Sequence, residues 1–412
     1  MKTVLATAYA INPYKGSEDG MGWNFVMQIA RFNKVIAITR ENNRPHIEKY
    51  MRENPSGLYR NAEFHYFDTP SWTRFWKRGS RGAMLYYLLW QRMVVSFIRK
   101  SNLRFDIVHN LNFHNDWSPS FLWKLGKPFV WGPIGHHPLI PAPYLKPFPF
   151  KYFLKDRLTW LIKKFFWKFS PALRKSIKNA AVIWSMNSSV RNVIDLQGKM
   201  EQVSPSVATQ DFGWNEKQDV NDEKTADAFS LISVGRLVPL KGFDLTIRAF
   251  AAFIKNIGEA EKENTLLTIV GSGPEEQLLK NMCVEEGVSD YVRFISWIDR
   301  TDVMELFRNA SVFVFPSHEG AGMVVPEALS FGVPVIALDN EGPGEFLTPE
   351  CGITVPQSDY RTTVSHLAGA IGTLYRNPGK LEQMRRAARK HFEEHFHWDR
   401  RGEKLKSIYE NL

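Results

Sequence analysis

The sequence predicts an α/β protein made of two doubly wound domains of parallel strands, with a cleft between them. Short apolar runs with strand character alternate with longer amphipathic stretches, which is typical of parallel sheets with helices on both faces. The pattern restarts near Ala228, after a polar and weakly patterned segment. The chain has 412 residues, more than a single hydrophobic core usually supports.

The individual elements follow from these runs. In the first half we expect strands at 3–9, 34–40, 106–110, 127–132 and 180–185, and a helix at 22–31. In the second half we expect strands at 229–236, 265–271, 292–297, 310–317 and 333–339, and helices at 243–257 and 275–286. The predicted domains are 1–209 and 228–392, joined by a linker at 210–227. The periodicity of the helical end at 393–412 suits either domain, and we assign this helix to the first.

The composition argues against several classes of protein. Two cysteines, Cys283 and Cys351, are too few for a disulfide framework or a thiolate metal site, and they fit a reducing cytosol. No run of eighteen apolar residues occurs, so we expect no transmembrane helix. The N-terminal MKTVLATAYA is broken by threonines and followed by Asn12 and Pro13, which favours a first strand over a signal peptide.

Two glutamates, Glu319 and Glu327, stand eight residues apart in the stretch PSHEGAGMVVPEALSFGVPVIA. The turn Gly320–Val325 would lie between a strand and a helix at the carboxyl edge of the sheet, where ligands bind in open α/β folds. Pro326 fits the first turn of that helix, because its missing N–H is not needed there. Both carboxylates can then face the cleft and accept hydrogen bonds from sugar hydroxyls. Taken singly, each glutamate is equally well explained by the helix dipole or by solvation.

The stretch SVGRLVPLKGFD places two cations, Arg236 and Lys241, around a glycine-containing turn ahead of a helix. This arrangement suits a pyrophosphate. Taken alone, the pair is more simply explained as ordinary surface cations.

Two glycine-rich turns are less specific. Gly271 and Gly273 in IVGSGPEEQL do not make a dinucleotide fingerprint, because Glu276 stands where the third glycine is needed. Near the N-terminus, Gly20 and Gly22 belong to a glycine-punctuated loop that enters a helix. This loop is explained either as a cover over a phosphate or as a plain connector.

In this order the motifs resemble glycosyltransferase family 4, the retaining nucleotide-sugar transferases with the GT-B fold. The resembling signals are GRLVPLKG, the IVGSGP turn, the E-x7-E motif EGAGMVVPE and SFGVPVIA, over residues 230–345. The first half resembles the family more loosely, through GSEDGMGW and DIVHNL.

The resemblance implies a role for each motif. Arg236 and Lys241 would neutralise the donor diphosphate, which is the leaving group, and the N–H groups of 322–324 would meet a phosphate. Glu319 would contact the transferred sugar, and Glu327 the ribose hydroxyls. The family usually has an aromatic residue at position 321 and no proline at 326, which leaves the donor sugar open. The implied donor-binding set is Gly20, Gly22, Arg236, Lys241, Gly271, Ile298, Glu319, Ala321, Gly322, Met323, Val324 and Glu327.

Histidines follow two predicted strands of the first half. His109 ends one strand and His114 comes soon after it, while His136 and His137 follow the next strand. In similar transferases a histidine of the first domain lies beside the reacting sugar. A buried histidine that only satisfies a neighbour explains each of them equally well. The predicted acceptor-side residues are His109, His114 and His136, and the predicted catalytic residues are Glu319, His109, Arg236 and Lys241.

The net charge of +10 is concentrated in two segments that are also rich in aromatic residues. Residues 71–100 contain seven Lys or Arg and no acid, and residues 139–180 contain ten and one acid. Within the latter, 154–169 has the pattern of an interfacial amphipathic helix. We therefore expect both segments to meet an anionic membrane surface, although a core helix with a solvated basic face is an alternative. Nucleic acid is a weaker candidate, because no recognised binding module is present.

The leading interpretation is a retaining glycosyltransferase that moves a hexosyl group from a nucleotide-diphosphate sugar to a sugar or glycolipid hydroxyl, in surface polysaccharide assembly. No metal or cofactor is expected, in agreement with the absence of an Asp-x-Asp pair. The expected location is cytoplasmic, on the inner face of the membrane. The alternatives are a nucleotide-sugar 2-epimerase of the same fold and a non-catalytic nucleotide-sugar-binding protein. The sequence does not reveal the base, the sugar, the acceptor, the linkage or the oligomeric state.

Overall fold

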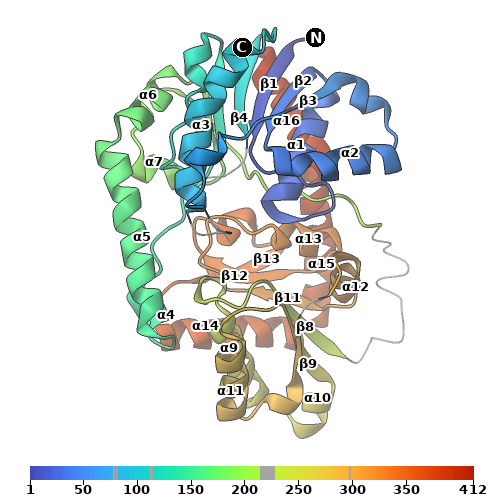
Figure 1. The fold of residues 1–412 in the computed structure, drawn as a ribbon. Coiled ribbons are helices and arrows are strands. Elements are labelled where there is room, and N and C mark those ends of the chain that lie inside the picture. The colour runs from blue at the N-terminus through green and yellow to red at the C-terminus, as the bar shows by residue number, and fades with distance from the viewer. Residues whose placement is uncertain (78, 80–81, 112–114, 214–227, 297) are drawn as a thin grey trace. The chain divides into compact units, whose positions relative to one another are not determined.

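The computed structural model describes residues 1–77, 79, 82–111, 115–213, 228–296 and 298–412. They form two compact α/β units (Figure 1). The first unit consists of 1–136, 160–208 and 398–412, and the second unit of 137–159 and 209–397.

The first unit contains a seven-stranded parallel sheet in the order β3-β2-β1-β4-β5-β6-β7. The strand order reverses between β1 and β4, as in a doubly wound fold. Its strands are β1 (Thr3–Ala8), β2 (Lys34–Thr39), β3 (Ala62–Tyr66), β4 (Ile107–Leu111), β5 (Phe129–Ile134), β6 (Val182–Ser185) and β7 (Met200–Val203).

The second unit contains a six-stranded parallel sheet in the order β10-β9-β8-β11-β12-β13. Here the order reverses between β8 and β11, so the loops that follow these two strands start side by side. Its strands are β8 (Phe229–Val234), β9 (Thr265–Val270), β10 (Val292–Ile295), β11 (Val312–Phe315), β12 (Val335–Asp339) and β13 (Gly352–Pro356).

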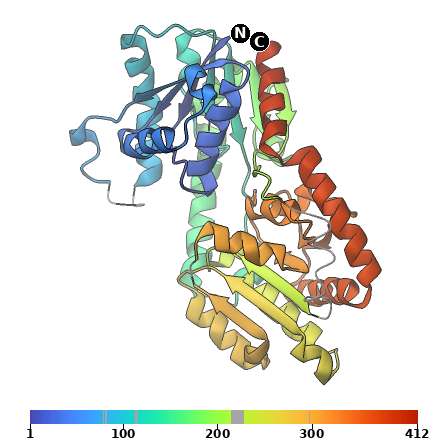
Figure 2. The same ribbon diagram turned by 90° about the vertical axis from the view of Figure 1, so that its right-hand side faces the viewer.

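Amphipathic helices cover the sheet of the first unit. Helix α1 (Ser17–Ala30) packs against α16 (Trp398–Glu410), and the N- and C-termini lie together (Figures 1 and 2). Helix α3 (Ala83–Lys100) buries seven side chains, Trp90 among them, in a core that it shares with the strands and with α6 (Pro171–Asn179). The other α-helices before β8 in the described residues are α2 (Arg44–Glu53), α4 (Ala142–Leu145), α5 (Phe150–Phe169) and α7 (Val190–Val193). Of these, α4 and residues 150–159 of α5 belong to the second unit.

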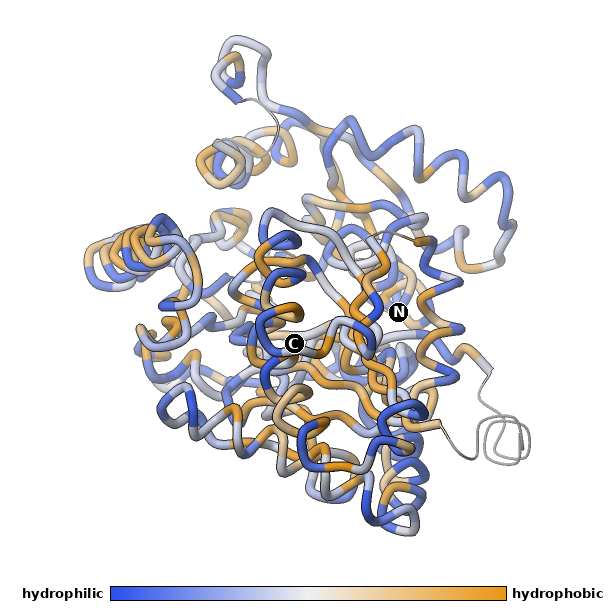
Figure 3. Tube along the Cα trace, turned by 90° about the horizontal axis from the view of Figure 1, so that it is seen from below, coloured by the Kyte–Doolittle hydropathy of each residue, from blue (hydrophilic) through white to orange (hydrophobic). Residues whose placement is uncertain are grey.

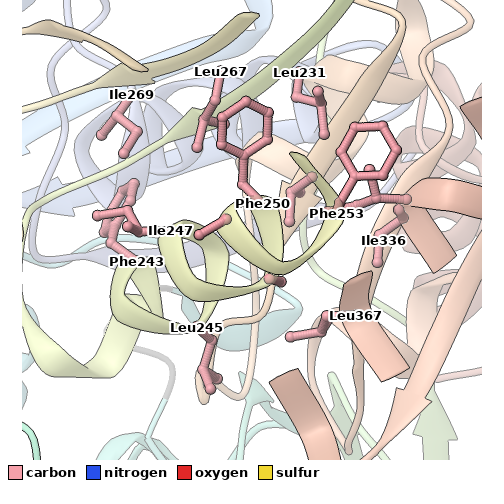
Figure 4. Close-up of a cluster of buried hydrophobic side chains, with 14 of the residues drawn as sticks. Leu231, Phe243, Leu245, Ile247, Phe250, Phe253, Leu267, Ile269, Ile336 and Leu367 are labelled. Carbon is pink, nitrogen blue, oxygen red and sulfur yellow. The ribbon is translucent and has the colours of Figure 1, made fainter. Parts of the chain in front are cut away.

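The main core of the second unit forms around α9 (Phe243–Ile254), whose apolar residues recur at helical spacing. Figure 4 shows Phe250 and Phe253 of this helix facing Leu231 and Leu267 of the sheet. Helices α11 (Glu276–Glu286) and α14 (Tyr360–Arg376) join the same core. The remaining α-helices in the part of the second unit that the structure describes are α10 (Glu259–Glu263), α12 (Arg300–Arg308), α13 (Val324–Ser330) and α15 (Pro378–His395).

The structure corrects two of the predicted boundaries. Residues 137–159 belong to the second unit, because Ile140, Tyr144 and Leu145 are buried in its core. The predicted C-terminal helix is broken at 396–397, and only its last part, α16, belongs to the first unit. Of the predicted linker, residues 214–227 lie outside the described residues.

The helices of the two predicted membrane-facing segments, 71–100 and 139–180, differ in how much of each is buried. Within 71–100, helix α3 buries seven of its eighteen residues, so one face of this helix packs in the core of the first unit. In contrast, α5 has no buried residue, and hydrophobic and hydrophilic residues both recur along its trace at the left of Figure 3. Among the described helices, none is long and apolar enough to cross a bilayer.

Candidate nucleotide-sugar site

The two loops at the β8/β11 switch point are joined by hydrogen bonds. The first loop leaves β8 at Gly235 and contains a short 3₁₀ turn, Pro239–Lys241. The second loop follows β11, and its His318 N–H donates to the Leu240 carbonyl at 2.9 Å. Gly242 has φ 70°, and a Cβ there would lie 2.1 Å from the Pro316 carbonyl oxygen, so only glycine fits.

These loops bring two predicted site residues into contact. Lys241 Nζ donates to Glu319 Oε2 at 2.7 Å, and the side chains are 16% and 19% exposed. The same ammonium lies 5.1 Å from the ring centroid of Phe315. The side chain of Arg236 is exposed, and its guanidinium makes no hydrogen bond or ion pair with any other described residue. The switch point therefore presents one paired and one unpaired cation.

The second glutamate of the motif is buried in α13. Glu327 Oε1 accepts a hydrogen bond from Arg300 at 2.6 Å, while Oε2 has no hydrogen-bond partner among the described residues. Burial raises the pKa of this carboxyl group, and Arg300 acts in the opposite direction. Arg300 is the second residue after Ile298, which is half-buried in the turn after β10. The ion pair therefore fixes one carboxylate oxygen and leaves the other with bonding capacity.

The predicted turn after Glu319 and the helix that carries Glu327 are both present, but the turn ends at Met323 and not at Val325, because α13 begins at Val324. Residues Gly320–Met323 form the turn, and Pro326 lies in the first helical turn of α13. Gly322 is needed because a Cβ there would lie 2.9 Å from the Phe315 ring. The helix ends at Ser330, and shortly after it Gly332 has φ 64° and the N–H of Val333 donates to the Ala328 carbonyl.

Gly271 supports the Arg236 loop from the neighbouring strand β9. Its φ is 146°, and a Cβ would lie 1.8 Å from the Gly235 carbonyl oxygen. Leu237 N–H also donates to the Ser272 carbonyl at 3.0 Å. Gly271 therefore lets the loop after β8 pack against the end of β9. The comparison with the dinucleotide fingerprint did not indicate this packing role.

Two residues that the sequence analysis did not assign hold the Glu319 loop in place. Asn340, after β12, donates to the Ser317 carbonyl at 2.7 Å and accepts from the Gly342 N–H at 3.1 Å. His137 Nδ1 accepts a hydrogen bond from the Gly320 N–H at 3.1 Å. The glycine-rich stretch NEGPGEF, which begins at Asn340, indicates a turn there and could have pointed to the Asn340 contacts. Nothing in the sequence indicates the contact between His137 and Gly320, because these residues are 183 positions apart.

The predicted catalytic place of His109 at a loop is wrong. This residue lies within β4 with 0% exposure, and both ring nitrogens are hydrogen-bonded. Nε2 lies 2.7 Å from the Gly132 carbonyl oxygen, and Nδ1 lies 2.6 Å from the Tyr409 hydroxyl. Burial lowers the pKa of His109 to about 4. The residue is therefore part of the core of the first unit.

The other predicted residues of the first unit have different surroundings. His136 Nδ1 lies 2.8 Å from Asp116 Oδ2, and both residues are buried after the carboxyl ends of β5 and β4. Gly20 and Gly22 lie inside α1 and not in a loop, because the helix already begins at Ser17. His114 lies outside the described residues.

Solved structures identify the fold of this chain. A sucrose-phosphate synthase from Thermosynechococcus elongatus has a TM-score of 0.67 at 17% identity, and the match covers 100% of this chain and 99% of that one. HepE from Anabaena, solved with UDP and glucose, has a TM-score of 0.64 at 14% identity, with 100% of both chains covered. With the two doubly wound sheets, these matches show that the chain has the GT-B fold.

The sequence comparisons find relatives of part of this chain, most of it in the second unit. Residues 215–391, which are less than half of the chain, match the family described as Glycosyl transferases group 1. A GDP-mannose-dependent monoacylated α-(1-6)-phosphatidylinositol monomannoside mannosyltransferase from Corynebacterium glutamicum is 33% identical over 43% of this chain and 45% of its own length. The lipopolysaccharide core biosynthesis glycosyltransferase LpsD from Rhizobium meliloti is 39% identical over 30% of this chain and 34% of its own length. The chain thus spans less than half the length of these two relatives.

Proposed function

We propose that the protein is a retaining glycosyltransferase that moves a hexosyl group from a nucleotide-diphosphate sugar to a hydroxyl of a sugar acceptor. The observation that carries this proposal is the Lys241–Glu319 contact beside the exposed Arg236, at the switch point of the unit that matches the group 1 family. Two cations and a carboxylate on adjoining loops suit a ligand that has a diphosphate at one end and a sugar at the other.

The cations would act on the leaving group. When the bond between the sugar and the diphosphate breaks, negative charge develops on the diphosphate, and Arg236 and Lys241 would stabilise it. Lys241 has three N–H donors, so one can stay on Glu319 while the others reach phosphate oxygens. We propose no metal or other cofactor for this step.

The two glutamates would orient the donor. Glu319 would accept hydrogen bonds from the transferred sugar. The Oε2 atom of Glu327 would accept hydrogen bonds from the ribose hydroxyls. A departing phosphate oxygen would take the proton of the acceptor hydroxyl, so the proposed reaction needs no separate protein base. Rate enhancement would then come from positioning and from stabilisation of the leaving group.

The names of the relatives support a lipid-linked acceptor. The Corynebacterium protein is named for a phosphatidylinositol mannoside and LpsD for the lipopolysaccharide core. We propose that this chain extends a glycolipid of the same broad class, in surface polysaccharide assembly on the cytoplasmic face of the membrane.

The test is calorimetric titration of the full chain with UDP, GDP and ADP in the presence of EDTA. We expect one nucleotide to bind selectively and the Arg236→Ala/Lys241→Ala variant to lose binding. The matched control, Lys255→Ala/Lys380→Ala, removes two exposed cations of the same unit and should bind as the parent does.

The matching nucleotide sugar is then incubated with and without a glycolipid extract. Release of the nucleoside diphosphate that depends on the extract supports transfer, and conversion of the sugar without any acceptor would indicate an epimerase. Absence of binding to all three nucleotides would contradict the proposal.

A further inference from the structure

Helix α5 presents an apolar face to solvent along its whole length. No residue of this helix is buried, and seven large apolar side chains on it are 48–73% exposed. Scattered exposed apolar residues are ordinary on a protein surface, but a continuous set on one helix needs an explanation. The seven are Phe150, Leu154, Leu158, Leu161, Ile162, Phe165 and Phe169.

These seven residues form a single stripe. At about 100° per residue, they fall within an arc of about 120° on the helix surface. The other side of the helix is already used: Tyr152 and Phe153 pack on the core of the second unit, and Trp167 packs on the core of the first. The exposed stripe is therefore additional to the face that holds α5 to the protein.

Basic residues border the stripe on both sides. Lys151 and Lys155 lie near one edge, Lys164 and Lys168 near the other, and all four are exposed. The only acid of the helix, Asp156, is 2.6 Å from Arg157 and so is already paired. An apolar strip between rows of lysines matches a lipid surface, where acyl chains meet the strip and anionic headgroups meet the ammonium groups.

We propose that α5 is the site at which this protein docks on an anionic lipid membrane. A second copy of the chain fits the same surface less well, because pairing two α5 helices would bring two rows of positive charge together. This proposal rests on α5 alone, so it stands or falls independently of the transferase activity.

The test is flotation of the full chain with vesicles of phosphatidylcholine, with and without phosphatidylglycerol, at physiological salt. We expect binding to the anionic vesicles and at least about tenfold weaker binding by the variant Leu158→Gln/Leu161→Gln/Phe165→Gln. The control Met200→Gln/Leu266→Gln/Val284→Gln changes three side chains of 37–70% exposure outside both predicted membrane-facing segments and should bind as the parent does.

The lysines are tested separately with Lys155→Gln/Lys164→Gln/Lys168→Gln. The preference for phosphatidylglycerol should fall by about fivefold for each lysine removed. The control Lys34→Gln/Lys380→Gln/Lys390→Gln makes the same change of charge at exposed positions outside α5 and should keep most of the preference.

An environment-sensitive dye shows whether the stripe itself enters the lipid. Both native cysteines are buried, so a dye on Phe165→Cys reports from the stripe and a dye on Thr159→Cys from the same helix beside it. The proposal is supported if anionic vesicles shift the emission of the dye at position 165 to the blue by more than they shift that of the dye at position 159. Lack of vesicle binding, or equal binding by the α5 and control apolar variants, would overturn it. So would a dimer in sedimentation that dissociates in the α5 variant while vesicles fail to bind.

Discussion

At His109, burial and two hydrogen bonds determine the protonation state. A carbonyl oxygen only accepts, so Nε2 must carry the proton that it donates to Gly132, and Nδ1 accepts from the Tyr409 hydroxyl. The neutral ring is therefore the form that the fold stabilises. The sequence analysis predicted the strand correctly but placed His109 at its end, whereas the residue lies in the middle of β4. Its partner Tyr409 is 300 positions away, and no local pattern indicates that pairing.

This arrangement predicts a pH dependence of stability. Because the pKa is about 4 in the folded protein and about 6.5 in the unfolded chain, only the unfolded chain binds the proton between these values. The free energy of unfolding should thus fall on acidification through this window, by up to about 1.4 kcal/mol per pH unit. Urea unfolding from pH 7.5 to 4.5 checks this, with the His109→Asn variant lacking the contribution. Parallel curves for the parent and the variant would show that His109 is not held neutral.

At the scale of elements, glycines let the loops of the switch point pack together. We expect Gly271→Ala to lower stability by about 1–3 kcal/mol, because its φ is 146° and its Cβ would overlap the Gly235 carbonyl. The same variant should weaken nucleotide binding, since it displaces the loop that carries Arg236. The control is Gly369→Ala on α14, where a Cβ meets nothing within 4 Å and alanine should stabilise by about 0.5–1 kcal/mol. Thermal unfolding and nucleotide titration measure both effects, and equal stability of the two variants would contradict the expectation.

The position of a strand in its sheet decided whether the sequence could predict it. Interior strands such as β4 and β11 are buried on both faces, so they appear as continuous apolar runs. The strands that the analysis missed, β3, β7 and β13, are all edge strands with exposed or half-buried residues. Their sequences, AEFHY, MEQV and GITVP, contain no continuous apolar run, so they resemble loops. The site was predictable where its residues cluster in one motif, and it was missed where a partner such as His137 or Asn340 comes from a distant loop.

At the scale of the whole molecule, the last fifteen residues, 398–412, complete the unit with which the chain begins. Trp398 packs edge-on against Phe25 at 5.3 Å, and Tyr409 reaches both His109 and, through its carbonyl, Lys2. Arg401 is buried and donates to the Val207 carbonyl. Periodicity predicted a helix here, but these long-range contacts are what assign it to the first unit.

Truncation after His397 should therefore unfold one unit selectively. Loss of α16 leaves the His109 Nδ1 atom and the Val207 carbonyl without their hydrogen-bond donors and opens the core around Phe25. We expect hydrogen exchange followed by mass spectrometry to show lost protection in β1, β4 and β5 but retained protection in β8 and β11. Nucleotide affinity should persist, because Arg236, Lys241, Glu319 and Glu327 all belong to the second unit.

Deletion of residues 411–412 alone is the control and should change neither the hydrogen exchange nor the nucleotide affinity. Loss of protection throughout both units would show that they do not fold separately, and loss of nucleotide binding with an intact second unit would show that the first unit contributes to the donor site.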